Sequence, residues 1–233
     1  MLAHFGVLVL LTVFVGLGIW QLDRLDQKKA FNAHLLERTH LPVADLATLR
    51  GDAASVEYRS VLARGTFDAA NEFVLLSRSF DGLSGHEVVT PLLLGPDDAV
   101  LVDRGWVPLD DDTPPVAAAL PPGGVVEVTG VLFPSQMRGR FGPRTPPDGK
   151  LTRTFRIEIP RLAPQFPYRL RPVYLQLEHQ DPAQPGALPK VIPPPSLSEG
   201  PHLSYALQWF SFALIASIGY VVMMRRARAE ARR

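Results

Sequence analysis

One histidine of this sequence stands among residues that suit the binding of a flat, apolar ligand. Tyr205 and Trp209 follow His202 by three and seven residues, a spacing that places the three side chains on one face of a helix. His202 opens that helix, so the positive end of the helix dipole disfavours an imidazolium and keeps the ring neutral. A neutral imidazole can ligate a haem iron, but it can also serve as an interfacial hydrogen-bonding group. The pattern leaves both readings open.

A second group of candidate residues lies near the other end of the chain. Trp20, Gln21 and Arg24 follow an apolar stretch, and Trp20 and Arg24, four residues apart, share a helical face. If the two segments pair as helices, the tryptophan would join the aromatic residues named above as an apolar wall. The guanidinium of Arg24 would then suit an anionic group such as a propionate.

The sequence lacks the residues that most catalytic mechanisms need. The chain has no cysteine, which excludes disulfides, thiolate metal sites and a cysteine nucleophile. Gly82–His86 has a histidine where the G-x-S-x-G pattern of hydrolases needs glycine, and neither a phosphate-binding glycine loop nor HExxH occurs. The paired acids Asp97-Asp98 and Asp110–Asp112 lie in turn-like stretches that indicate solvated loops. We therefore expect no enzyme. A membrane-anchored hydrolase is the alternative, without a visible nucleophile–base set.

Two apolar stretches must position the candidate residues. Phe5–Leu22 and Leu203–Met224 contain no charge and no proline, and each is long enough to cross a hydrocarbon core of about 30 Å as a helix. We predict transmembrane helices over residues 1–22 and 201–224, with a helical extension over 23–42. A cleaved signal peptide is the competing interpretation of the first stretch, which lacks a charged leading region and a small-residue cleavage site.

The charge distribution predicts how the chain would lie in a membrane. Residues 225–233 carry five arginines and one glutamate, and such basic flanks stay in the cytoplasm. Two spans place both termini on that side, so residues 43–200 would be extracytoplasmic at a bacterial plasma membrane. This middle segment is slightly acidic, which argues against nucleic acid as a partner and leaves the lipid bilayer. A nucleic-acid or lipid-specific role for the tail is the less favoured alternative.

The middle segment has the pattern of a β domain. Short β-branched or aromatic runs are separated by Gly, Asp, Asn and Pro. The predicted strands are Val61–Phe67, Phe73–Ser79, His86–Leu94, Val100–Val107, Val125–Leu132, Thr152–Ile159 and Pro172–Leu177. Asp110–Pro122 and Asp181–Pro195 read as proline-rich connectors. The predicted fold is an α+β membrane protein, with two terminal helices flanking an antiparallel β-sheet or barrel.

Five stretches, in order, resemble the motifs of the Surfeit-locus (Shy-type) cytochrome c oxidase assembly factors. They are GIWQLDRLDQK at Gly18–Lys28, GTF at Gly65–Phe67, the segment Gly85–Leu92, VLVDRGWVP at Val100–Pro108 and HLSYALQWF at His202–Phe210. Each motif is modest, whereas the ordered set covers almost the whole chain. One position departs from the pattern, because Pro201 stands where many relatives have asparagine.

The resemblance implies a non-catalytic role in the maturation of haem-copper oxidases. The expected step is insertion of haem a into the catalytic subunit of cytochrome c oxidase, with haem A synthase as a further possible partner. In bacterial relatives the closing-motif histidine, here His202, is the proposed ligand of a transiently bound haem a. The alternative function is a scaffold that binds an oxidase subunit without haem.

The internal motif has a structural and a functional interpretation. Trp106 can plug the sheet core while Arg104 pairs with Asp103 or another acid. Alternatively, this strand end forms part of a partner or haem surface. Gly65 and Gly105 are expected to serve close packing or a bulge.

Overall fold

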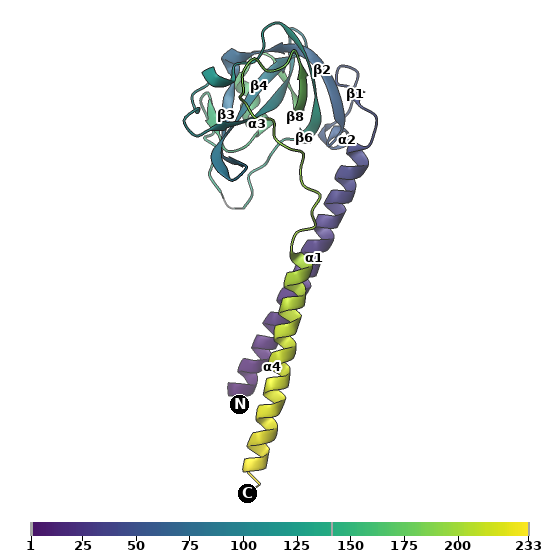
Figure 1. Cartoon of the computed structure of the whole chain (residues 1–233), viewed down its shortest axis with the longest axis vertical. Coiled ribbons are helices and arrows are strands. Elements are labelled where there is room, and N and C mark those ends of the chain that lie inside the picture. Colours follow the sequence, from purple (N-terminus) through teal and green to yellow (C-terminus); the bar gives the residue numbers. More distant parts are fainter. Residues whose placement is uncertain (1, 141, 233) are drawn as a thin grey trace. The chain divides into compact units, whose positions relative to one another are not determined.

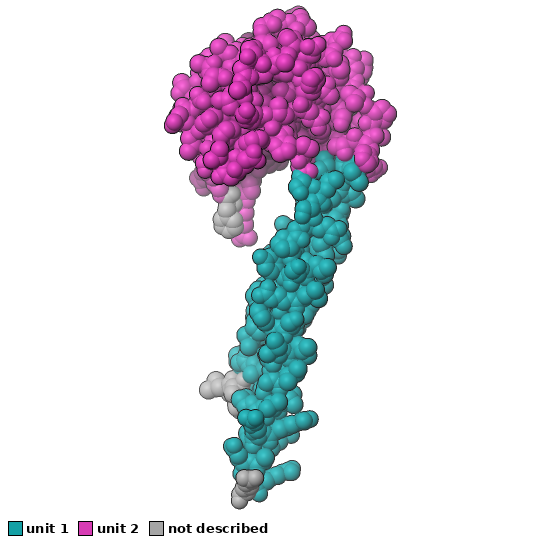
Figure 2. All heavy atoms as spheres, in the orientation of Figure 1, with its two compact units in different colours: residues 1–36, 196–233 teal, residues 37–195 magenta. Residues whose placement is uncertain are grey.

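The computed structural model describes residues 2–140 and 142–232, with the backbone alone for Leu2 and Ala3. The chain divides into two compact units. The first contains residues 1–36 and 196–233 and the second residues 37–195 (Figure 2). The long helices belong to the first unit and the strands to the second (Figure 1).

Two helices dominate the first unit. Helix α1 (Leu2–Thr39) runs unbroken from the apolar stretch into the charged extension, and α4 (His202–Glu230) begins directly after Pro201. The most apolar window of each helix is exposed, with 11% of it buried in α1 and 6% in α4. The core helix of a soluble domain would bury such a window. Both helices therefore have the length, composition and exposure that a membrane span requires.

The second unit is a mixed β domain. Its strands are β1 (Ala44–Asp45), β2 (Ser60–Phe67), β3 (Phe73–Phe80), β4 (Leu83–Leu93), β5 (Asp98–Pro108), β6 (Val125–Pro134), β7 (Arg153–Thr154) and β8 (Arg169–Asp181). Short helices α2 (Ala53–Val56) and α3 (Ile159–Leu162) and the 3-10 turns η1 (Ala69–Asn71), η2 (Ala117–Ala119) and η3 (Ala163–Gln165) connect them. Five of the predicted strands are confirmed as β2 to β6.

The sheet closes on itself. The strands follow the order β1-β2-β6-β8-β5-β4-β3-β7, and β2 also pairs with β4 through Thr66–Leu93 and Phe67–Leu92. The ring β2-β6-β8-β5-β4 is thus a small barrel with β3 added outside β4. At the closure, a Cβ on Gly65 would lie 2.2 Å from the carbonyl oxygen of Leu93. Only glycine allows this approach, as expected for Gly65.

The prediction of a purely antiparallel sheet is wrong. β8 runs parallel to β5, β1 parallel to β2, and β7 parallel to β3. A parallel pair requires a long return connection, and the one between β5 and β8 runs from Pro108 to Arg169 and includes β6. β8 lies between β6 and β5 and joins the two halves of the barrel.

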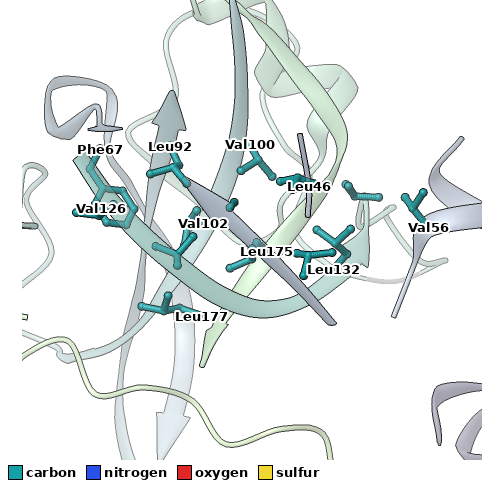
Figure 3. Packing of buried hydrophobic residues seen from close by; sticks show 14 residues of the cluster. Leu46, Val56, Phe67, Leu92, Val100, Val102, Val126, Leu132, Leu175 and Leu177 are labelled. Carbon is teal, nitrogen blue, oxygen red and sulfur yellow. The ribbon is translucent and has the colours of Figure 1, made fainter. Parts of the chain in front are cut away.

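The main core fills the barrel. Alternate residues of five strands point inward, because successive side chains of a strand face opposite sides of the sheet. Figure 3 shows this packing, which includes Phe67, Leu92, Val100, Val102, Val126, Leu132, Leu175 and Leu177.

A second apolar cluster lies on the outer face of β3, β4, β5 and β8, where α3 and η3 cover it. This cover corrects one strand prediction. Within Thr152–Ile159 only Arg153–Thr154 is a strand, and Ile157, Ile159 and Leu162 pack onto the sheet from irregular and helical backbone. The last strand is longer than predicted. Pro172, which has no N–H to donate, lies at a register shift between β5 and β8.

Candidate functional site

The two long helices touch along a seam of small residues. Gly18 is buried, and a Cβ there would lie 2.5 Å from Cε1 of Phe210. Ala206 and Ala213 of α4 are also buried, so small side chains bring the helices close together. Phe14 packs near Trp209 and Phe212, with ring centroids 5.8 Å apart in each pair.

A polar pair joins the helices at each end of this seam. Nδ1 of His202 lies 2.9 Å from Oε1 of Gln21, and Nδ1 of His4 bonds the hydroxyl of Tyr220. A hydrogen bond between helices is favoured in an apolar environment, where the unpaired groups would find no water. Gln21 and His202, both predicted site residues, are therefore in direct contact.

The segment before α4 is tied to the same face of α1. Nδ2 of Asn32 donates to the carbonyl oxygen of Leu197 at 2.6 Å, and Nζ of Lys29 lies 3.8 Å from the carboxylate of Glu199. Gly200 then adopts φ +71°, a left-handed conformation that glycine takes without strain. These contacts deliver His202 to the start of α4 beside Gln21.

The hydrogen bond decides which nitrogen of His202 can act as a ligand. The oxygen of a side-chain amide only accepts, so Nδ1 must be the protonated nitrogen, and a neutral ring then carries its lone pair on Nε2. Among the described residues, none hydrogen-bonds Nε2. A Cβ on Gly200 would lie 3.6 Å from this atom, which is an ordinary van der Waals distance. A neutral imidazole with a lone pair on Nε2 is the chemistry that would be needed to hold a haem iron.

The other predicted residues are distributed around this pair. Trp209 belongs to the aromatic packing in the seam. Trp20 and Tyr205 are 52% and 48% exposed, so about half of each side chain lies outside the packed seam. Arg24 donates to Oε1 of Gln27 at 2.8 Å and is exposed. No group of three metal-ligating side chains is found in the described part of the chain.

The internal motif forms a buried bulge of the β domain. In the register of β4 and β5, Val88 pairs with Gly105 and the next residue, Val89, pairs with Asp103. Arg104 is therefore the extra residue. Gly105 has φ +128°, and a Cβ there would lie 2.2 Å from the carbonyl oxygen of Lys190. Its expected role in a bulge and close packing is confirmed.

The side chains of this motif point into the domain. Trp106 stacks on Phe80 with ring centroids 5.8 Å apart. The buried guanidinium of Arg104 lies over the Phe67 ring and donates to Glu72 at 3.4 Å and to Gln184 at 2.6 Å. Arg104 thus pairs with Glu72, an acid other than Asp103. This pairing agrees with the structural interpretation of the motif.

Burial dominates the electrostatics of this ion pair. It raises the pKa of Glu72, against the lowering effects of the Val116 N–H, Thr90 and Arg104. Burial likewise lowers the pKa of Arg104 to about 10, opposed by Glu72. Each charge is retained because the other offsets part of its desolvation.

A comparison with known protein families identifies the chain. The model of the SURF1 family matches residues 8–214, which include most of α1, the whole β domain and the first part of α4. The chain belongs to the SURF1 family. This family is known in general as a family of oxidase assembly factors.

SURF1-like proteins from distant organisms resemble the chain over nearly its whole length. One from Rickettsia felis is 28% identical over 222 residues, which cover 94% of this chain and 95% of the relative. An uncharacterised SURF1-like protein of Mycobacterium tuberculosis is 29% identical, covering 94% and 82% of the two chains. One from Monosiga brevicollis is 27% identical, covering 96% and 88%.

The β domain also contains an interaction between two acidic residues that the sequence did not predict. Glu87 and Asp103 contact each other, and burial raises the pKa of both; the charge of Glu87 raises that of Asp103 further. Nε of Arg78 donates to Glu87 at 2.8 Å. Both acids lie within strands rich in β-branched residues, whereas solvated acids favour turns. Their position in the sequence was therefore the signal that could have indicated their burial.

Proposed function

We propose that this SURF1 protein assists the insertion of haem a into the catalytic subunit of cytochrome c oxidase. It would bind haem a transiently at the outer membrane face, with Nε2 of His202 as the iron ligand. One observation carries the proposal: the bond from Nδ1 to Gln21 leaves Nε2 with an unused lone pair at the junction of the two helices. Membership of the SURF1 family supports the assignment to oxidase assembly.

The protein would act as a two-span protein of a bacterial plasma membrane. The apolar faces of α1 and α4 would meet lipid, because they are exposed in the unit that the helices form. The arginines after Met224 would hold both termini in the cytoplasm, which places the β domain outside. His202 and Gln21 then lie at the outer boundary, and His4 and Tyr220 at the inner one.

The chain's own residues supply binding and no catalysis. Trp20 and Tyr205 would offer apolar surface to the porphyrin, and Arg24 would meet a propionate by exchanging its bond to Gln27. A single protein ligand suits a carrier, because release requires only one coordination bond to break. Haem A synthase would be the donor and the oxidase subunit the recipient.

The test is the haem content of the detergent-purified protein after co-expression with haem A synthase. We expect haem a in the wild type and its loss in His202→Ala. His40→Ala removes an exposed histidine beyond the end of α1 and should keep full haem content. In His202→Gly, added imidazole should restore haem binding, because it can replace the missing ring.

The same experiment distinguishes the haem-free scaffold. A scaffold predicts no haem in any variant, with the oxidase subunit still co-purifying with His202→Ala. If a folded His202→Ala protein retained haem, another residue would be the ligand and the assignment to His202 would be wrong.

A further inference from the structure

We infer that Gln21 is a positioning residue that holds His202 in the tautomer and orientation needed for ligation through Nε2. The inference deepens the proposed function and rests on it, since it concerns the same histidine and the same cargo. Gln21 would not touch the porphyrin. Its influence would pass through the 2.9 Å hydrogen bond between its Oε1 and Nδ1 of His202.

The chemistry of the pair gives this bond its direction. The amide oxygen of Gln21 has lone pairs and no proton, so the imidazole must donate. A proton on Nδ1 leaves the lone pair on Nε2, and an acceptor behind a ligating histidine generally strengthens the bond from the other ring nitrogen to the metal. Loss of the acceptor would let the proton occupy either nitrogen.

The position of Gln21 is fixed from both sides along α1. Gly18, Gln21, Leu25 and Asn32 recur at spacings of three, four and seven residues, so they share one face of the helix. Gly18 meets Phe210, Leu25 is buried, and Asn32 bonds the backbone of Leu197. The amide is therefore presented to His202 by a packed seam.

The other end of the helix pair offers a matched control. The hydroxyl of Tyr220 bonds His4 and also links α1 to α4, but it lies far along the helix from His202. Tyr220→Phe removes one hydrogen bond between the helices, as Gln21→Leu does. A purely structural role of Gln21 would make the two variants behave alike.

The first measurement uses haem-free protein. Histidine labelled with ¹⁵N distinguishes protonated from unprotonated ring nitrogens, and the His202 signals are those that disappear in His202→Ala. We expect a proton on Nδ1 in the wild type, in Tyr220→Phe and in Gln21→Glu, which retains an acceptor. The spectra are recorded at alkaline pH to keep the ring neutral. Gln21→Leu should give a mixture of tautomers.

The second measurement is haem a affinity by optical titration. Gln21→Leu should weaken binding about 10–100-fold, the usual effect of removing a partner behind a metal ligand. Gln21→Glu should restore binding and lower the midpoint potential of the bound haem, since a carboxylate accepts more strongly. Tyr220→Phe should bind as the wild type does.

The outcomes separate this inference from the proposed function. Wild-type protein without haem overturns both. Haem binding by the wild type with unchanged affinity in Gln21→Leu, or a proton on Nε2 in the wild type, overturns the role of Gln21 alone. Equal losses in Gln21→Leu and Tyr220→Phe would make Gln21 a helix-pairing residue.

Discussion

A Cβ on Gly18 would overlap the ring of Phe210, at 2.5 Å from Cε1. We therefore expect Gly18→Leu to separate α1 from α4 at a cost of about 1–3 kcal/mol, typical of overpacking. The chain has no cysteine, so two cysteines introduced at Phe14 and Phe212, whose ring centroids are 5.8 Å apart, would report the helix contact by cross-linking with a bifunctional thiol reagent. Its yield should fall in Gly18→Leu.

Gly16 supplies the control for this experiment. A Cβ there meets no described atom within 4 Å, so Gly16→Leu should leave the cross-link unchanged. Equal yields in both leucine variants would contradict the close approach at Gly18.

Gly105→Ala should destabilise the β domain. The new methyl group would meet the carbonyl of Lys190, and the residue would also hold an unfavourable φ of +128°. Strained backbone of this kind costs about 1–3 kcal/mol before the clash is added. Gly124→Ala is the control, because its φ of +79° carries strain while no described atom lies within 4 Å of the new group. Denaturant midpoints should fall further for Gly105→Ala, and equal shifts would argue against the clash.

The buried acids should make domain stability fall as pH rises. Burial and Glu87 raise the pKa of Asp103 well above its ordinary value of 3.8, so the folded state binds more protons than the unfolded state above that pH. Stability is then lost as pH rises from that value through the folded pKa. Asp103→Asn removes this titration but keeps an acceptor for the Gly105 N–H.

The measurement is the midpoint of chemical unfolding as a function of pH. The decline toward neutral pH should be shallower in Asp103→Asn than in the wild type. Asp148→Asn, at an exposed acid, should retain the wild-type slope. A slope unaffected by Asp103→Asn would mean that this carboxyl ionises in the folded domain without penalty.

Arg104 and Glu72 should behave as one buried unit. Arg104→Met leaves the carboxylate of Glu72 without its cation and should cost roughly 3–5 kcal/mol. Glu72→Gln leaves the buried guanidinium of Arg104 without its anion and should cost a similar amount, whereas the double variant should lose less than the sum of the two. A double-mutant cycle of unfolding free energies measures this coupling, and strictly additive losses would contradict it.

The exposed pair of Arg64 and Glu127 is the comparison for this cycle. Its guanidinium lies 2.7 Å from the carboxylate but is largely in water. Arg64→Met should therefore change stability by about 0–1 kcal/mol. The two experiments test whether burial or proximity decides the strength of an ion pair here.

The sequence predicted the elements better than their arrangement. The runs that became β2 to β6 were recognisable because β-branched residues alternate between turn residues. The parallel pairing of β8 with β5 was not recognisable, because it depends on contacts between segments about 70 residues apart. Residues 155–159 have the composition of a strand, but they serve as an apolar cover beside Pro160.

The candidate site shows the same division. Helical spacing indicated the face that carries His202, and the aromatic residues beside it were visible in the sequence. The partner of its Nδ1 was not, because Gln21 is 181 residues away and meets it only through the helix seam. Glu72 escaped notice for the same reason, since its partner Arg104 is 32 residues distant.

The place of β8 in the barrel has a consequence for biosynthesis. β8 is the last strand of the domain to leave the ribosome, yet it lies between β6 and β5. A nascent chain that ends before Arg169 exposes two unpaired strand edges, the kind of surface that promotes aggregation. The domain can close only when synthesis has nearly reached α4, so maturation of the β domain and completion of the second long helix are almost simultaneous events.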